Sequence, residues 1–389
     1  MFDRHAGGER VILLALDFGD PDYTDSVAEL RLLAQGAGLE IVGEVLGKRS
    51  RPDAALFAGS GKVDEIATLV LVTAADVVIF NHELSPAQER NLERRLQCRV
   101  IDRVSLILDI FARRAASAEG KLQVELAQLQ HLSTRLIRGW THLERQRGGV
   151  GMRGPGEKQL ETDRRLIGVR VKALKERLSR LEKQRRTQRR ARERNNVLSV
   201  ALVGYTNAGK SSLFNALTRA EAYEADQLFA TLDTTTRKMY LPSQGEWVGR
   251  EVVLADTVGF ITRLPHSLIA AFRATLEATA EADLLLHVID TASPNRERQI
   301  IEVDKVLEEI GAGHAETFQV YNKLDLAGIA PGVSRDEYGK LRAVYVSART
   351  GAGLDLLRTA LTEILSGLRA ANEPTLNDDI PSQHFVSAS

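Results

Sequence analysis

The 389-residue sequence has a single cysteine, Cys98, and no run of about 18 uninterrupted apolar residues that would predict a membrane span. A lone thiol cannot build a disulfide framework or a cysteine metal cluster. The N-terminus also lacks a basic flank followed by an apolar segment, so no secretory signal is expected. We therefore expect a cytoplasmic protein, and its 43% hydrophobic residues are enough to fill the cores of two or three domains.

Net charge is absent as well, because 52 basic residues balance 52 acidic ones. The balance is uneven along the chain: residues 121–196 contain 21 Lys and Arg against 8 Asp and Glu, a net charge of +13, which leaves −13 for the remainder. Basic helices are often only solvated faces, but a basic segment in an otherwise acidic molecule is typical of binding to RNA phosphates. The arginines that we expect to contact RNA are Arg147, Arg153, Arg185, Arg186, Arg189 and Arg190.

The same segment has two apolar stripes, in residues 122–136 and 160–181. Apolar residues recur there at steps of three, four and seven, which predicts two amphipathic helices. Residues 148–156 between the stripes contain five glycines and one proline, and such a run is too flexible to continue a helix. We expect residues 118–196 to form an antiparallel helical hairpin with a glycine-rich tip, about 45 Å long.

Strand-like and helix-like runs alternate in residues 1–117, which predicts a small parallel α/β domain. Ser85, Pro86 and Gln88 predict one helix start with a capping box. The expected strands cover residues 10–18, 40–46, 76–81 and 99–103, and the expected helices cover residues 22–36, 62–74, 86–97 and 104–117.

Residues 59–62 read Gly-Ser-Gly-Lys and resemble half of a phosphate-binding loop. Leu56 stands at the position of the required earlier glycine, and Val63 stands where a Ser or Thr would ligate Mg²⁺. We expect a loop or a helix start here rather than a second triphosphate site.

A complete phosphate-binding loop lies in residues 204–211, between a strand-like run and a helix-like run. Such a loop points its backbone N–H groups at the β-phosphate, while Lys210 reaches the β and γ oxygens and Ser211 ligates Mg²⁺. A nucleoside triphosphate is the expected ligand. The candidate contacts are Gly204, Tyr205, Thr206, Asn207, Ala208, Gly209, Lys210, Ser211 and Ser212.

Three further motifs follow strand-like runs in the order of a G domain. Asp256 can hold a Mg²⁺-bound water, and the Gly259 N–H can contact the γ-phosphate. The Asp325 carboxylate can accept from guanine N1–H and the 2-amino group, while Asn322 can meet N7 and Lys323 can pack along the base. The third motif places a backbone N–H near guanine O6. The motifs are Asp256, Thr257, Val258 and Gly259; Asn322, Lys323, Leu324 and Asp325; and Ser347, Ala348 and Arg349.

These motifs predict a P-loop G domain with a doubly wound sheet in residues 197–368, followed by a flexible tail in residues 369–389. The fold class is therefore α/β, with a parallel N-terminal domain, a long helical hairpin and a G domain.

The chain resembles the HflX family of ribosome-associated GTPases over residues 5–370. The resemblance includes the phosphate-binding loop, the run from Phe229 to Asp233, and the glycine-rich run 148–156, which generic small GTPases lack. It identifies Phe229, Ala230, Thr231, Leu232 and Asp233 as switch I, with Thr231 as the second Mg²⁺ hydroxyl. Spacing alone leaves Thr234, Thr235 and Thr236 open for that role. The resemblance also implies GTP-dependent binding to the large ribosomal subunit and separation or rescue of stalled ribosomes.

Phe260 stands where Ras-like proteins have the glutamine that orients the attacking water, so intrinsic hydrolysis should be slow. Positioning and charge neutralisation must then come from a partner or from a bound monovalent cation. Related GTPases use an asparagine at the position of Asn207 to hold K⁺, although this side chain can also serve only to stabilise the loop. The expected catalytic residues are Lys210, Thr231 and Gly259.

We predict a monomeric GTP hydrolase whose nucleotide state controls ribosome binding, with Mg²⁺ as cofactor. Two alternatives stay open: a GTPase of RNA modification or ribosome assembly, and a non-catalytic switch at a membrane surface. The apolar stripes disfavour lipid, because they are expected to pack against each other.

Overall fold

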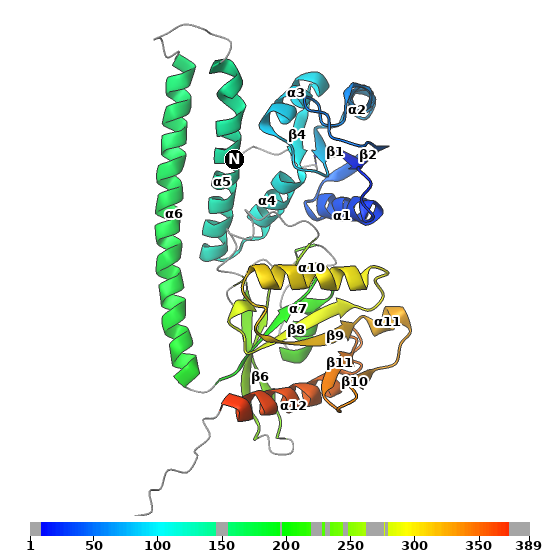
Figure 1. Ribbon diagram of the computed structural model, residues 1–389, viewed down its shortest axis with the longest axis vertical. Helices are drawn as coiled ribbons and strands as arrows, with labels where there is room; N and C mark the ends of the chain where they lie inside the picture. Colours follow the sequence, from blue (N-terminus) through cyan, green and yellow to red (C-terminus); the bar gives the residue numbers. More distant parts are fainter. Residues whose placement is uncertain are drawn as a thin grey trace, which may run out of the picture.

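The computed structural model describes residues 9–144, 155–194, 197–218, 228–229, 234–243, 248–261, 276 and 279–372. Two separate β-sheets, each covered by helices, lie along a pair of long antiparallel helices (Figure 1). None of the helices within those ranges is long and apolar enough to cross a membrane.

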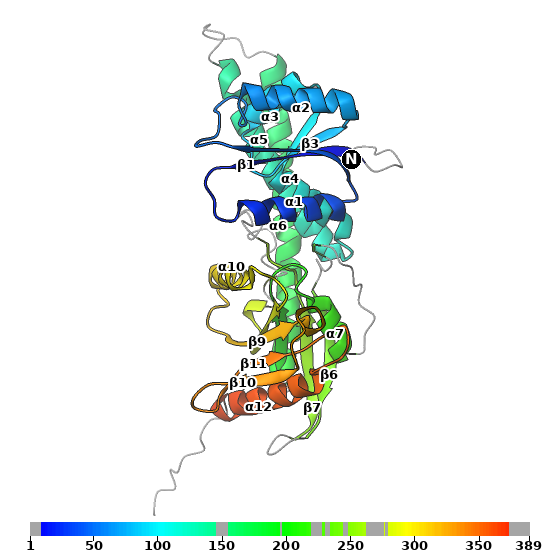
Figure 2. The same cartoon turned by 90° about the vertical axis from the view of Figure 1, so that its right-hand side faces the viewer.

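The N-terminal sheet has four parallel strands in the order β2-β1-β3-β4. Helices α1 and α4 cover one of its faces and α2 and α3 the other (Figure 2). Alternate residues of β1 serve the two cores: Val11 and Leu13 face α1 and α4, whereas Ile12 and Leu14 face α2 and α3. The strands are β1 (Arg10–Asp17), β2 (Glu40–Lys48), β3 (Val77–Phe80) and β4 (Arg99–Asp102), and the helices are α1 (Tyr23–Gly36), α2 (Ser60–Thr73), α3 (Pro86–Leu96) and α4 (Arg103–Arg114).

The predicted alternation of strands and helices in this domain is confirmed, and so is the predicted capping box. The backbone N–H of Gln88 donates to Ser85 Oγ at 3.3 Å, and the Gln88 side chain accepts from the Ser85 N–H at 2.9 Å. Pro86 is the first residue of α3, where a missing N–H costs nothing.

The helical hairpin is formed by α5 (Ala118–Glu144) and α6 (Pro155–Arg194). The predicted stripes pack against each other, with Leu126, Leu174 and Leu178 buried between the two helices. Helix α5 also lies on the N-terminal domain, where Arg135 contacts Asp102 at 2.6 Å. Helix α6 begins at Pro155, so the last two residues of the expected tip belong to it, and residues 145–154 lie outside the described residues.

The second sheet has seven strands in the order β10-β11-β9-β8-β5-β7-β6, and its two edge strands, β6 and β10, run antiparallel to their neighbours. Helices α7 and α12 pack on one face and α10 on the other, which confirms the predicted doubly wound G domain. The strands are β5 (Ser199–Val203), β6 (Thr235–Leu241), β7 (Arg250–Asp256), β8 (Leu284–Asp290), β9 (Glu316–Asn322), β10 (Gly332–Arg335) and β11 (Leu341–Tyr345), and the helices are α7 (Lys210–Thr218), α10 (Arg296–Glu309), α11 (Leu324–Ala327) and α12 (Leu354–Asn372). The domain boundaries stay predictions, and α12 continues four residues past the expected boundary at 368.

Candidate nucleotide-binding site

The loop between β5 and α7 encloses the side chain of Lys210. Its ammonium donates to the carbonyl oxygens of Tyr205 at 2.8 Å and Gly204 at 3.1 Å. Burial lowers the pKa of Lys210 to about 8, although the nearby Asp256 carboxylate acts in the opposite direction. A cation held inside such a loop is placed to meet phosphate oxygens.

Two side chains expected to bind the metal, Ser211 and Asp256, lie next to each other. Ser211 Oγ donates to Asp256 Oδ2 at 2.7 Å. Asp256 ends β7 and is buried, and Thr257 after it anchors β7 to β5 by donating to the Leu202 carbonyl at 2.6 Å. A hydroxyl and a carboxylate are hard oxygen donors, which suit Mg²⁺.

Gly259 lies against the phosphate-binding loop. A Cβ atom at this position would lie 2.8 Å from Thr206 Cγ2, 2.9 Å from Thr206 Cα and 3.0 Å from Lys210 Nζ. The neighbouring peptide is also fixed, because Thr206 N–H donates to the Phe260 carbonyl at 2.7 Å. Only glycine therefore fits without moving the loop, and its backbone lies beside the lysine ammonium.

Phe260 is fully buried in the core beneath α10. Its ring therefore does not belong to the polar surface of the site, and it has no group that can orient a water molecule. This placement agrees with the expectation that the glutamine role is absent here.

The base-recognition motifs are tied to the phosphate-binding loop through Asn322, which ends β9. Its Nδ2 donates to the Ala208 carbonyl at 3.0 Å, and its Oδ1 accepts from the Ala348 N–H at 2.9 Å. These two bonds hold three loops together, and they use only one of the two hydrogens on Nδ2, so the expected contact with guanine N7 stays a prediction. Asp325 Oδ1 accepts from Ser347 Oγ at 2.7 Å, which fixes the carboxylate expected to read guanine.

The other residues predicted to contact the nucleotide lie in or beside the same loops. Asn207 is exposed, with a left-handed φ of 60°, and Arg349 is exposed in the loop after β11. Leu324 is buried at the start of α11, and Ser212 lies partly buried in the first turn of α7. Val258 is buried against the N-terminal domain.

Switch I is described only in part. Phe229 is buried in the core of the N-terminal domain, with its ring 4.7 Å from that of Phe111 at an angle of 78°. Thr235 and Thr236 begin β6, and Thr235 pairs with Asp256 in the sheet register. The predicted residues Ala230, Thr231, Leu232 and Asp233 lie outside the described residues.

Two features of this site were not predicted from the sequence. The first is a contact between domains: the Tyr205 hydroxyl donates to Glu29 of α1, which is also paired with buried Arg103. The second is an ion pair between Lys323 Nζ and Asp290 Oδ2 at 2.8 Å. Asp290 ends β8, so the signal that located the other motifs, a polar residue at the end of a strand-like run, would also have found it.

The expected RNA-binding arginines belong to residues 118–196, which precede this site in the chain. Arg185 of α6 is paired with Glu119 of α5 at 2.7 Å, so part of its charge is neutralised within the hairpin. The backbone of α6 contains Arg186, Arg189 and Arg190, whose side chains are outside the described part of the structure. Arg147 and Arg153 also lie outside it.

Comparison with known proteins covers the whole architecture. Residues 24–112 match the family model described as GTP-binding GTPase N-terminal, residues 114–192 match GTP-binding GTPase Middle Region, and residues 199–323 match 50S ribosome-binding GTPase. The chain is 55% identical over 368 residues to GTPase HflX of Escherichia coli (strain K12), covering 94% of this chain and 85% of that protein. It is 48% identical over 367 residues to GTPase HflX of Caldanaerobacter subterraneus subsp. tengcongensis, covering 92% and 83%. The crystal structure of a complex of SsGBP with GDP has a similar fold, with a TM-score of 0.50 at 24% identity, and covers 92% of this chain and 99% of that one.

Proposed function

The chain belongs to the HflX family of GTPases and is a GTP-hydrolysing enzyme, and we propose that its nucleotide state controls binding to the large ribosomal subunit through the basic hairpin. The 50S ribosome-binding description of the family model for residues 199–323 supports the choice of partner. Separation or rescue of stalled ribosomes is the outcome that we propose for this binding, in the cytoplasm and by a monomer.

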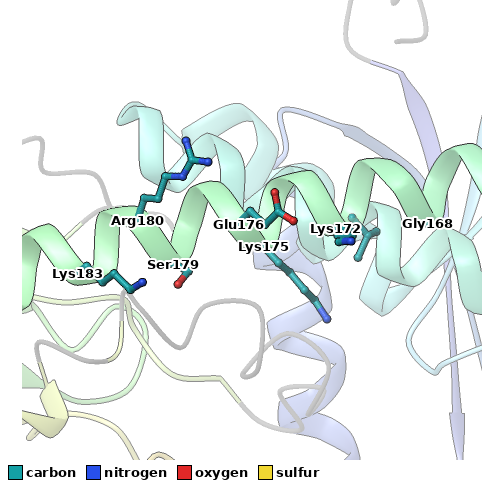
Figure 3. A pocket seen from close by; sticks show the side chains of 8 residues that line it. Gly168, Lys172, Lys175, Glu176, Ser179, Arg180 and Lys183 are labelled. Carbon is teal, nitrogen blue, oxygen red and sulfur yellow. The ribbon is translucent and has the colours of Figure 1, made fainter.

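The observation that carries the proposal is a basic hollow on α6 (Figure 3), beside the apolar stripe to which its lining residue Val171 belongs. Four cations, Lys172, Lys175, Arg180 and Lys183, line it together with one carboxylate, Glu176. All four cations are exposed, and the side chains of Lys175 and Lys183 extend on the same side of the helix (Figure 3).

Lysines grouped in this way suit a phosphate backbone, which is recognised by charge and shape rather than by base edges. Lys172, Lys175 and Lys183 recur at intervals of three and eight residues, which brings them to one face of a helix. Arg185 contributes less to this face, since it is already paired with Glu119. We therefore propose that the lysines of the hollow, together with the arginines predicted from the sequence, contact ribosomal RNA.

For the nucleotide, we propose that guanine lies at the edge formed by Asn322 to Asp325 and Ser347 to Arg349, and that the phosphates lie in the loop 204–211. Ser211, Asp256 through a water molecule, and Thr231 are the residues that would hold Mg²⁺, whose charge would stabilise the β- and γ-phosphates. The hydrogen bond between Ser211 and Asp256 supports this donor set, because it brings the two described oxygen donors together. Asn207, exposed at the loop, is the proposed contact for K⁺.

The test is sedimentation of purified protein with large ribosomal subunits on sucrose gradients, with a GTP analogue or with GDP. Replacing Lys172, Lys175 and Lys183 by Gln should weaken binding and lower its log–log salt dependence by up to about 0.7–0.9 per lost phosphate contact. The arginine set Arg185, Arg186, Arg189 and Arg190 changed to Gln should act in the same direction. GDP affinity should stay unchanged, because none of these residues is among the predicted nucleotide contacts.

A matched control removes three positive charges elsewhere: Lys238, Lys305 and Lys340, which are exposed and paired with glutamates in the G domain. This control should sediment like the unmodified protein. Equal binding by all variants would show that the hairpin is a solvated face and would move the RNA contact to another domain. Binding to immature particles or transfer RNA instead of mature subunits would favour a role in assembly or RNA modification.

A further inference from the structure

Asp290 is the last residue of β8 and lies opposite Asn322 of β9 in the register of the parallel sheet. Its Oδ2 is 2.8 Å from Lys323 Nζ, and its Oδ1 accepts from the Ala292 N–H at 3.0 Å. The side chains of Asp290 and Lys323 are only 21% and 20% exposed, so the pair is partly shielded from solvent. Asp290 thus holds the lysine of the base-recognition motif from the neighbouring strand.

The backbone of Lys323 is fixed as well. It has a left-handed conformation, with φ 66° and ψ 37°, at the start of α11. Its side chain passes close to the phosphate-binding loop, because a Cβ atom on Gly209 would lie 4.0 Å from Lys323 Cε. The methylene chain is therefore confined between a fixed backbone, the loop and the Asp290 carboxylate.

We propose that Asp290 is a positioning residue for guanine. By holding the Lys323 ammonium, Asp290 keeps the methylene chain of this lysine in an ordered position, and the purine ring packs against that chain. The inference rests on the placement of guanine at this edge, proposed above. A purine ring gains most from an apolar surface that is already ordered, because no side-chain freedom is then lost on binding.

The charge of Asp290 matters in addition to its shape. The Lys323 ammonium is close enough to Lys210 to disfavour the charged form of that buried lysine. A carboxylate beside Lys323 offsets this repulsion and keeps the ammonium at the base side of the site. Asparagine at position 290 retains the acceptor for the Ala292 N–H but loses the charge.

D290N should weaken GTP and GDP by the same factor, about threefold to tenfold, because a partly shielded ion pair contributes roughly that much and neither contact reads the γ-phosphate. The measurement is equilibrium competition against a fluorescent GDP in Mg²⁺ buffer, with the full-length chain. Thermal unfolding without nucleotide identifies any variant that fails to fold.

The decisive comparison is a double-mutant cycle with K323M, which keeps an unbranched apolar chain but removes the ammonium. If Asp290 acts through Lys323, adding D290N to K323M should cause no further loss of affinity. A role in the turn alone, through the Ala292 N–H, predicts no loss in either background, because asparagine keeps that acceptor. An equal loss in both backgrounds would show that Asp290 acts independently of Lys323, and either result would overturn the proposal.

D325N separates this proposal from the placement of the base itself. If guanine lies at this edge, D325N should shift preference from GTP to XTP whatever Asp290 does. Unchanged GTP preference in D325N would reject the base placement. A normal shift in D325N together with equal losses across the cycle would reject only the role of Asp290.

Discussion

The two glycine-lysine segments of this molecule, at residues 59–62 and 204–211, follow strands β2 and β5 respectively, but their lysines lie in different surroundings. Lys210 is buried and donates to two carbonyls of its own loop. Lys62 lies on the first turn of α2 and pairs with Glu65 at 2.7 Å, with 31% of its side chain exposed. Only the second loop therefore encloses a cation.

The residues around the two lysines explain the difference. Ser211 follows Lys210 and donates to Asp256, whereas Val63 follows Lys62 and is buried in the N-terminal core. Above the first loop, Arg49 Nη1 donates to the Ala58 carbonyl at 2.6 Å and fills the space beside Gly59. The expected helix start is confirmed, since α2 begins at Ser60. A Gly-Lys pair thus needs both the following hydroxyl and an open cradle before it can be interpreted as a phosphate site.

The difference between the two lysines is tested most strongly by replacing each of them with alanine in turn. Lys210→Ala should reduce GTP hydrolysis by at least about 100-fold, because a point charge on the transferred phosphoryl group has no nearby substitute. Lys62→Ala should leave hydrolysis unchanged and cost at most about 1 kcal/mol of stability, as exposed ion pairs do. Phosphate release under GTP saturation measures both variants, and a comparable loss in Lys62→Ala would show that the first loop also serves the nucleotide.

A smaller difference is expected between the glycines of the two segments, Gly209 and Gly61, when each is replaced by alanine. Gly209 has φ +90°, and a Cβ there would collide with the Asn322 amide that joins three loops. Gly209→Ala should destabilise the G domain by about 1–3 kcal/mol and weaken GDP binding. Gly61 is helical with open space around it, so Gly61→Ala should be neutral or stabilise by up to about 1 kcal/mol. Thermal unfolding with and without GDP tests the pair, and equal shifts in both variants would contradict the distinction.

Features set by neighbours in sequence could be predicted. The capping box at Ser85 depends on residues a few positions apart, and so does the spacing within each of the two apolar stripes that contain Leu126, Leu174 and Leu178. The structure has both features. The order of the G-domain motifs was also sufficient to predict the doubly wound sheet, because each motif ends a strand.

Features set by distant residues could not be predicted. The Tyr205 hydroxyl meets Glu29 across 176 positions of sequence, and Phe229 enters a core built by α1 and α4. No local pattern indicates which surface of one domain will contact another. Similarly, the two bonds of the Asn322 amide depend on how three loops meet, so this link between the loops could not be predicted, while the contact with the base stays a prediction.

The smallest expected effect is a difference in proton uptake: Lys210 should take up a proton when GDP binds, whereas Lys62 should not contribute. Burial lowers the pKa of Lys210 to about 8, so near pH 8 about half of the free protein carries a neutral amine there. Phosphate oxygens favour the ammonium and raise this pKa again, so GDP binding at pH 8 should take up about half a proton, and at pH 6.5 almost none. Affinity should accordingly be flat below pH 8 and fall as the pH rises above it. Calorimetry in two buffers of different ionisation enthalpy measures the uptake, with Lys62→Ala as the control that should behave like the unmodified protein. No proton uptake at pH 8 would mean that the Lys210 ammonium is already fully charged before the phosphates arrive.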